Sequence, residues 1–260
     1  MPVYWPQNAA KDTRNLLSPT VGLVSSVQSV AGTLIIAHRG ASAEAPENTN
    51  PAFRRAIAMG ADGIELDVQV SRDGVPVVFH DTNLRRLTGV AGRLSARTWP
   101  ELKKLRVLGG SAGIPRLVDV LTLTRRRIVV QIELKPDAAV GPVLAAVKKA
   151  GAASWVILAS FEPSLVREAA RLAPAIPRML ISEGRQTPGA LVRQLESCEA
   201  HGLSINCQKV RRADYVRFFQ AKGFAVWCWT VNEVALAGRL VGWGIDGLLS
   251  DNPALLKRLT

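Results

Sequence analysis

Two of the chain's three histidines follow short strand-like runs and stand beside charged residues. His38 comes directly after Leu34–Ala37 and precedes Arg39, and His80 follows a second apolar run and precedes Asp81. An imidazole with an ordinary pKa of about 6.5 changes charge around neutrality, so one ring can accept a proton from a nucleophile while the other donates one to a leaving group. We therefore predict that His38 and His80 are catalytic. The alternative is that each is a hydrogen-bonded histidine of the core.

Three carboxylates occupy strand positions that can share one face. Glu65 and Asp67 are two residues apart in the run Gly63–Val70, so both side chains project to the same side of a strand. Two anions on one face repel, and a divalent cation bound through carboxylate oxygens removes the repulsion. Glu133, in the run Ile128–Leu134, can supply a third oxygen ligand. We predict a metal site made of these three carboxylates, with ion pairs to arginine as the alternative.

Two basic side chains accompany these carboxylates. Lys135 lies two residues after Glu133, on the same predicted strand face, and Arg39 follows His38. The planar guanidinium of an arginine suits phosphate or carboxylate recognition, and the lysine can bind an anion as a point charge. The alternatives are a local Glu133–Lys135 pair and a surface arginine. Together with a cation site, the two basic groups predict an anionic substrate.

The elements that must position these residues follow one rhythm. From Thr33 onward, short runs rich in β-branched residues alternate with amphipathic stretches, which predicts repeated βα units and a parallel sheet. Eight units in about 250 residues fit a TIM barrel, an α/β fold, better than a doubly wound sheet. The turn Ser71–Gly74 predicts one extra, hairpin strand at Val75–Phe79. The predicted barrel strands are Leu34–Ala37, Gly63–Val70, Ile128–Leu134, Trp155–Ala159, Arg178–Ile181, Leu203–Cys207, Ala225–Thr230 and Gly247–Leu249.

Amphipathic stretches between these runs predict the helices. They are Asn48–Met59, Leu117–Thr124, Val140–Ala150, Pro163–Leu172, Pro188–His201, Ala213–Lys222 and Asn232–Val241. Residues 82–116 break the rhythm and contain a glycine-rich stretch, so we predict a small insertion on the barrel rim after the second strand. We expect residues 33–260 to form a single barrel domain.

The first 32 residues are predicted to be an N-terminal leader. The leader is too rich in Ser, Gln and Asn for a convincing signal peptide, and no apolar run approaches the ~20 residues of a membrane span. We therefore predict a cytoplasmic protein without stable membrane insertion. A short basic segment followed by apolar residues within the leader keeps export as the alternative.

The net charge of +12 makes nucleic acid, anionic membrane surfaces and anionic small molecules candidate partners. The basic residues are scattered, however, and aromatic residues make up only 5% of the chain without basic–aromatic interleaving, which argues against nucleic acid. Cys198, Cys207 and Cys228 are widely spaced and odd in number, so we predict buried free thiols. A small-molecule substrate is the partner that the composition favours, and the sequence does not indicate an oligomeric state.

Several short motifs, taken in order, resemble the glycerophosphodiester phosphodiesterase family. The resemblance runs from about Leu34 to the C-terminus and depends on the order of the motifs, because no single tripeptide is specific. The matching motifs are His38-Arg39-Gly40, Pro46-Glu47-Asn48-Thr49, Glu65 and Asp67, His80-Asp81, Glu133-Leu134-Lys135, Trp229-Thr230-Val231-Asn232, Gly244-Ile245-Asp246-Gly247 and Ser250-Asp251.

The resemblance implies a TIM barrel that hydrolyses a glycerophosphodiester to an alcohol and sn-glycerol 3-phosphate. It implies one divalent cation, Mg²⁺ or Ca²⁺, on the three carboxylates, acid–base catalysis by the two histidines, and phosphate binding by Arg39 and Lys135. It also implies that Trp229 packs against the glycerol, although Trp229 and Trp227 could both simply fill the barrel core. Glu47 and Asn48 also fit the start of the first helix, where they would cap Asn48–Met59 and support the Arg39 side chain.

Two other functions compete with this interpretation. A lysophospholipase D-like enzyme would cleave the same linkage in a substrate that carries an acyl chain, and it would need an apolar channel at residues 82–116, which are not conspicuously apolar. A catalytically silent barrel that binds phosphorylated ligands would fit the +12 charge. The paired histidines argue against the silent barrel, because a binding protein needs no acid–base pair.

Overall fold

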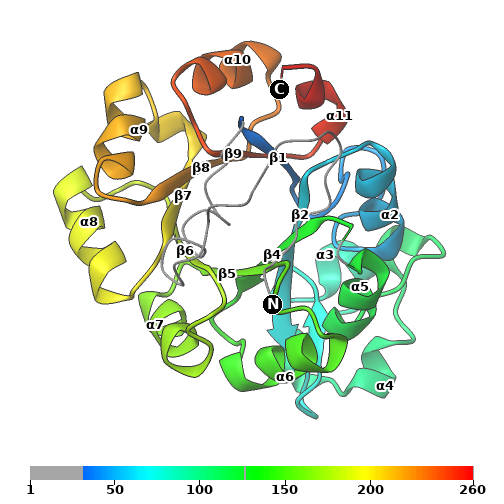
Figure 1. Ribbon diagram of the computed structural model, residues 1–260. Helices are drawn as coiled ribbons and strands as arrows, with labels where there is room; N and C mark the ends of the chain where they lie inside the picture. The colour runs from blue at the N-terminus through cyan, green and yellow to red at the C-terminus, as the bar shows by residue number, and fades with distance from the viewer. Residues whose placement is uncertain (1–31, 126, 260) are drawn as a thin grey trace.

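Eight parallel strands close into a barrel in the computed structural model, which describes residues 32–125 and 127–259. Around the barrel the strands follow the order β1-β9-β8-β7-β6-β5-β4-β2, and β1 pairs with β2 to close the ring (Figure 1). The predicted TIM barrel is therefore confirmed. The predicted leader lies outside the described residues, apart from Gly32.

The strand boundaries agree with the predicted runs to within one or two residues. The extra strand β3 pairs antiparallel with β2 across the predicted turn, which confirms the hairpin. The strands are β1 (Leu34–Ala37), β2 (Gly63–Val70), β3 (Pro76–Val78), β4 (Val129–Leu134), β5 (Val156–Ser160), β6 (Arg178–Ser182), β7 (Gly202–Asn206), β8 (Ala225–Trp229) and β9 (Gly247–Ser250).

The helices surround the barrel (Figure 1). They are α2 (Asn50–Ala58), α3 (Arg85–Thr88), α4 (Trp99–Leu102), α5 (Leu117–Thr124), α6 (Val140–Ala150), α7 (Pro163–Leu172), α8 (Pro188–Ser197), α9 (Ala213–Gln220), α10 (Val234–Gly242) and α11 (Pro253–Leu256). Single 3₁₀ turns form η1 (Leu94–Ala96), η2 (Val107–Gly109), η3 (Cys207–Lys209) and η4 (Lys257–Leu259).

Four predicted helix boundaries differ from the structure by two or more residues. The helix predicted to end at Lys222 ends at Gln220, and the one predicted to begin at Asn232 begins at Val234. The helix predicted to reach His201 ends at Ser197, because Glu199 adopts a left-handed conformation with φ of 54° and turns the chain toward β7. The helix predicted to begin at Asn48 begins at Asn50. Thr49 caps that helix, and its side-chain oxygen accepts a hydrogen bond from the Ala52 amide.

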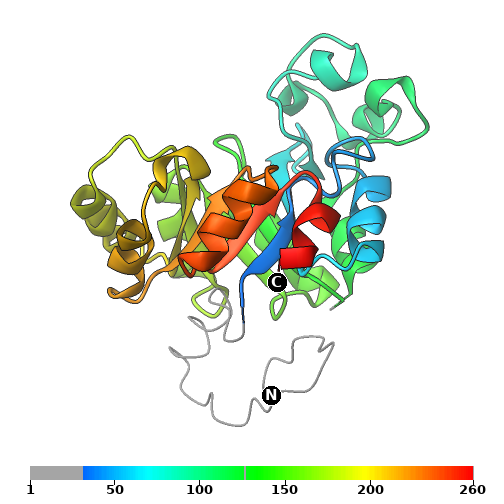
Figure 2. The ribbon, with the colours of Figure 1, turned by 90° about the horizontal axis from the view of Figure 1, so that it is seen from above.

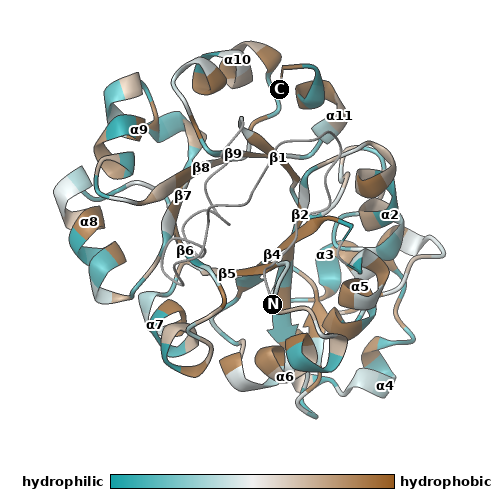
Figure 3. Ribbon diagram, viewed as in Figure 1, coloured by the Kyte–Doolittle hydropathy of each residue, from teal (hydrophilic) through white to brown (hydrophobic). Residues whose placement is uncertain are grey.

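Apolar side chains fill two layers. The outer faces of the strands pack against the helices, whose inner faces are the more hydrophobic ones (Figure 3). A separate cluster that includes Ile36, Met179, Trp227 and Leu249 fills the barrel interior. The three cysteines are buried free thiols, as predicted. Since the helix-facing layer and the inner cluster are both apolar, the polar residues that point inward stand out as candidates for function.

Residues 79–116, between β3 and α5, form a small unit of their own, here called the β3–α5 segment. It carries α3, α4, η1 and η2 around buried leucines and projects from one end of the barrel (Figure 2). The segment contains the predicted insertion at residues 82–116, and its status as an insertion stays a prediction. In the described part of the chain, no helix has the length and apolar character needed to cross a membrane.

Gly247 offers a test of packing in the barrel interior. It is the in-register neighbour of Trp227 on the adjacent strand, and an added Cβ would lie 2.8 Å from three atoms of the fully buried indole. We expect Gly247→Ala to destabilise the fold by about 1–3 kcal/mol, because overpacking forces side chains off their rotamers. Urea unfolding measures the change.

The matched control is Gly238→Ala in the middle of α10, where an added Cβ meets no atom within 4 Å. Alanine there should leave stability unchanged or raise it by up to about 1 kcal/mol, since it is the better helix former. Equal stability for the two variants would contradict the packing described for Trp227.

Candidate active site

Most of the predicted site residues line one cavity of about 300 Å³ inside the barrel. In parallel barrels the carboxyl ends of the strands meet at one face, and side chains there converge on the axis. Asp67 lies behind this lining and is 1% exposed. The lining residues are His38, Arg39, Glu65, His80, Gln131, Glu133, Lys135, Phe161, Ile181, Glu183, Ser204, Trp229 and Leu249.

The three predicted metal ligands form one cluster. One carboxylate oxygen from each of Glu65, Asp67 and Glu133 lies within 4.8 Å of the other two, and all three residues are buried. The register explains the arrangement: Asp67 is paired with Glu133 across β2 and β4, and Glu65 is paired with Gln131 one pleat below. Three buried carboxylate oxygens form a donor set that suits a hard divalent cation.

Asp67 is the best-compensated of the three carboxylates. Its Oδ1 lies 2.8 Å from Lys135 Nζ, and its Oδ2 accepts a hydrogen bond of 2.7 Å from Asn48 Nδ2 and lies 3.3 Å from Arg39 Nε. Burial disfavours the charged form of Asp67, but the Lys135 and Arg39 charges outweigh burial and hold the pKa of this carboxyl below its ordinary value. The alternative of an ion pair with arginine is therefore realised for Asp67.

Glu65 and Glu133 lack equal compensation. Burial, followed by the negative charge of Asp67, raises the pKa of both carboxyls. Glu133 contacts Lys135 Nζ at 2.5 Å, so the local pair exists, whereas Glu65 accepts a hydrogen bond from the Arg39 backbone amide, at 3.1 Å. A bound cation would remove the charge repulsion that raises these pKa values.

His38 contacts a carboxylate from near the C-terminus, that of Asp251. Its Nδ1 lies 2.8 Å from Asp251 Oδ1, and Asn232 Nδ2 donates to the second oxygen of Asp251 at 2.7 Å. Burial alone would lower the pKa of His38, but the hydrogen bond to Asp251 and then the Glu65 charge outweigh burial and raise it. Since Asp251 contacts Nδ1, Nε2 is the ring nitrogen of His38 that could exchange a proton with a ligand.

His80 has the same kind of partner but the opposite pKa shift. Its Nδ1 lies 2.8 Å from Asp81 Oδ1. Burial lowers the pKa of His80, and Lys135 adds to the lowering, while Asp67 opposes it. Since both histidines are tied through Nδ1 and their pKa values move apart, the pair has the chemistry of one proton donor and one proton acceptor.

The loop between β1 and α2 carries Arg39 and explains its motif. Arg39 has φ of 59°, and at Gly40, where φ is 83°, an added Cβ would lie 2.7 Å from the Ala52 Cβ. Glycine is therefore required after Arg39. Glu47 Oε1 accepts a hydrogen bond of 2.8 Å from Arg39 Nη1, so the prediction that Glu47 supports Arg39 is confirmed. The Asn48 side chain contacts Asp67 and does not cap the helix.

Trp229 lines the cavity, whereas Trp227 on the same strand face fills the barrel core. The Trp229 ring meets Phe161 edge to face, with 5.6 Å between ring centroids. Gln131 and Ser204 also line the cavity, and their buried side-chain polar atoms have no hydrogen-bond partner within the described residues. The cavity therefore has an apolar wall of two aromatic rings and free polar groups, which suits a small amphipathic ligand.

Comparison with known proteins agrees with the geometry. Residues 38–255 match the model of the glycerophosphoryl diester phosphodiesterase family. The chain belongs to this family. It is 33% identical over 241 residues to a glycerophosphodiester phosphodiesterase of Caldanaerobacter subterraneus subsp. tengcongensis, covering 87% of this chain and 97% of the relative.

Two solved structures extend the likeness to the fold of this family member. An Oleispira antarctica phosphodiesterase, in complex with the product sn-glycerol-3-phosphate, has a TM-score of 0.80 at 28% identity and covers 88% of this chain and 96% of its own. A glycerophosphodiester phosphodiesterase from Thermotoga maritima has a TM-score of 0.77 at 29% identity, with 88% and 98% covered. The predicted family resemblance is confirmed.

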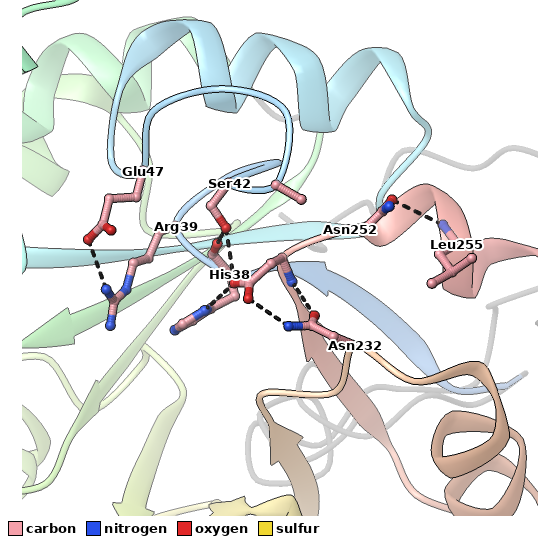
Figure 4. Close-up of a pocket in the computed structure, with 9 residues that line it drawn as sticks. His38, Arg39, Ser42, Glu47, Asn232, Asn252 and Leu255 are labelled. Atoms are coloured by element: carbon pink, nitrogen blue, oxygen red, sulfur yellow. Dashed lines mark hydrogen bonds and ion pairs between the residues drawn. The ribbon is translucent and has the colours of Figure 1, made fainter. Parts of the chain in front are cut away.

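The sequence interpretation assigned no role to several residues of this phosphodiesterase site. Asp251 and Asn232 belong to motifs of the family resemblance, and the sequence contained no other indication of a function for them. Ser42, whose hydroxyl donates to Asp251 Oδ1 at 3.0 Å, carried no signal. With Ala43, Leu255 and others, these residues line a second pocket of about 500 Å³ that shares His38 and Arg39 with the first (Figure 4).

The Asp251 contact predicts a change in the titration of His38. Asp251→Asn removes the negative charge that favours the imidazolium, so we expect the pKa of His38 to fall. Histidine NMR spectra of the metal-free protein measure the change, because the chain has only three imidazoles. Asp119→Asn on α5, which removes a carboxylate paired with Arg116, is the control. An unchanged pKa of His38 in Asp251→Asn would disprove the assigned contact.

Proposed function

We propose that the protein hydrolyses glycerophosphodiesters to an alcohol and sn-glycerol 3-phosphate. The observation that carries the proposal is the convergence, around one cavity, of a three-carboxylate cluster, two histidines tied to carboxylates through Nδ1, and two basic side chains. Membership of the family supports the reaction class, and the Oleispira antarctica relative was solved with the product sn-glycerol-3-phosphate.

Glu65, Asp67 and Glu133 would hold the divalent cation, Mg²⁺ or Ca²⁺. Their fit is supported by the donor set of three buried carboxylate oxygens and by the raised pKa values of Glu65 and Glu133, which reflect burial first and then repulsion by the charge of Asp67. When bound, such an ion stabilises negative charge that develops on a phosphoryl oxygen. In the mechanism below, the protein's own groups carry the proton transfers.

His38 and His80 would divide the proton transfers. The lowered pKa of His80 keeps its ring neutral near pH 7, with Nδ1–H donated to Asp81 and the Nε2 lone pair free to accept the proton of the attacking hydroxyl. The raised pKa of His38 favours its imidazolium, whose Nε2–H can protonate the departing alcohol oxygen. Overall, one water is consumed and one ester P–O bond is broken.

Arg39 and Lys135 would bind the phosphate. A phosphodiester carries one negative charge and gains further negative charge in the transition state. Cationic hydrogen-bond donors that are already in place stabilise this additional charge. Arg39 Nε is buried and has no aligned hydrogen-bond acceptor among the described residues, although it lies 3.3 Å from Asp67 Oδ2. Trp229, packed against Phe161, would contact the carbon face of the glycerol.

The same product-release assay distinguishes this activity from two competing functions. A lysophospholipase D-like activity would require an acyl channel, and a silent binding barrel would not need the two Nδ1-tied histidines. We further propose a cytoplasmic location, a role in lipid and glycerol metabolism, a small-molecule substrate and no nucleic-acid partner.

Metal dependence is the first test. We expect chelation to abolish the release of sn-glycerol 3-phosphate from glycerophosphocholine and glycerophosphoethanolamine, and Mg²⁺ or Ca²⁺ to restore it.

Glu65→Gln should lower metal affinity by about 100-fold or more, given that outer-sphere changes alone cost 10–100-fold. Calorimetric titration measures the affinity. Glu183→Gln removes a carboxylate that lines the cavity outside the cluster and should bind metal like the wild type.

Folded protein that releases no product with either ion would overturn the proposal. Cleavage of lysophosphatidylcholine alone would then favour the lysophospholipase, and binding of sn-glycerol 3-phosphate without turnover would favour the silent barrel.

The histidine roles predict a large loss of turnover. His38→Ala or His80→Ala should lower kcat by about 10²–10⁴-fold, the usual contribution of a positioned acid or base, while circular dichroism shows a folded barrel. His201→Ala is the matched control, because the third histidine precedes β7 at the opposite end of the barrel. Near-wild-type turnover in either of the first two variants would rule out the assigned roles.

A further inference from the structure

Arg86 joins two carboxylates that approach it from different parts of the chain. It lies on α3 in the β3–α5 segment, and its guanidinium makes two hydrogen bonds to each partner. Nε and Nη2 donate to Asp81 at 2.6 and 2.9 Å, while Nη1 and Nη2 donate to Glu47 at 2.8 Å each. The planar fork of an arginine can satisfy two carboxylates in this way, and a lysine ammonium cannot.

Each of these carboxylates holds a residue of the proposed active site. Asp81 Oδ1 lies 2.8 Å from His80 Nδ1, and Glu47 Oε1 accepts from Arg39 Nη1 at 2.8 Å. A continuous chain of charged contacts therefore runs from His80 through Arg86 to Arg39. Glu47 and Asp81 are both anions, so without the guanidinium between them they would repel each other and turn the groups they hold.

We propose that Arg86 is a positioning residue that fixes His80 relative to Arg39, and that the β3–α5 segment serves the reaction by delivering this guanidinium. The proposal rests on the proposed function for its kinetic consequences only. Arg86 itself does not line the catalytic cavity. It acts through Asp81 and Glu47.

The anchoring of α3 supports this role. Leu84 and Leu87 on either side of Arg86 are buried among the leucines of the β3–α5 segment, which fixes the short helix to its own small core. Arg86 is about half exposed, with a side-chain exposure of 48%. Exposed ion pairs contribute little to stability, so we infer that the main effect of these contacts is to orient Asp81 and Glu47. The hydrogen bonds from Arg86 are also the first cause of the lowered pKa of Asp81, about 2, which keeps that carboxylate charged at neutral pH.

The kinetic test compares Arg86→Ala with Arg85→Ala. Arg85 is the preceding residue on α3, is exposed, and makes no side-chain hydrogen bond or ion pair that the structure records in its described part. We expect Arg86→Ala to lower kcat/KM by about 10- to 100-fold. This is the usual loss when a residue that orients a functional group through an intermediate side chain is removed. We expect Arg85→Ala to match the wild type.

Two additions separate positioning from a merely structural role. Arg86→Lys keeps the charge but loses the fork, and it should remain as impaired as Arg86→Ala. Added guanidinium ion should restore part of the activity of Arg86→Ala, whereas added ammonium should not. Activity of Arg86→Ala within about twofold of the wild type would overturn the proposal, as would full activity of Arg86→Lys.

A spectroscopic readout keeps the test independent of turnover. In histidine NMR spectra, the Nδ1 signal of His80 should change in Arg86→Ala and stay as in the wild type in Arg85→Ala. If the wild type releases no sn-glycerol 3-phosphate, the proposed function fails, and the His80 signal still decides the role of Arg86. An unchanged His80 signal in folded Arg86→Ala would overturn the proposal by itself.

Discussion

The site depends on the burial of three carboxylates inside an apolar barrel. Glu65, Asp67 and Glu133 are each at most 9% exposed, and burying an unpaired carboxylate is strongly unfavourable. Lys135 and Arg39 compensate mainly at Asp67, which leaves Glu65 and Glu133 less well compensated, with raised pKa values. The remaining imbalance makes the cavity receptive to a cation, and a bound cation would in turn make it receptive to a phosphodiester.

This electrostatic requirement explains the irregular backbone beside it. The loop after β1 holds both Arg39 and Asn48 in left-handed conformations, with φ of 59° and 57°, and both side chains then reach Asp67. Such a conformation is unfavourable for Arg39 and better tolerated by asparagine, and the Arg39 contact to a buried anion offsets the strain. Glu47, from the same loop, orients the Arg39 guanidinium. The strained backbone of this loop therefore places the side chains that compensate the buried charge of Asp67.

The sequence predicted what local periodicity controls. Strand alternation was enough to put Glu65 and Asp67 on one face and to bring Glu133 beside them, since parallel strands align their carboxyl ends. Periodicity could not predict contacts between residues that are distant in sequence. Asp251 is separated from His38 by 213 residues, and Arg86 from Glu47 by 39. The end of α8 was also mispredicted, because Glu199 takes a left-handed conformation that glycine would ordinarily mark.

The longest of these contacts ties the active site to closure of the barrel. β1 and β9 pair in register from Leu34 with Gly247 to Ala37 with Ser250, so the residues that follow the two strands, His38 and Asp251, meet at the same level. Closure of the ring therefore creates the His38–Asp251 pair directly. On the other side of β1, the pairing with β2 brings the Arg39 amide to Glu65. The first strand thus lies between the His38–Asp251 pair and the carboxylate cluster, and the His-Arg-Gly motif at its end contacts both.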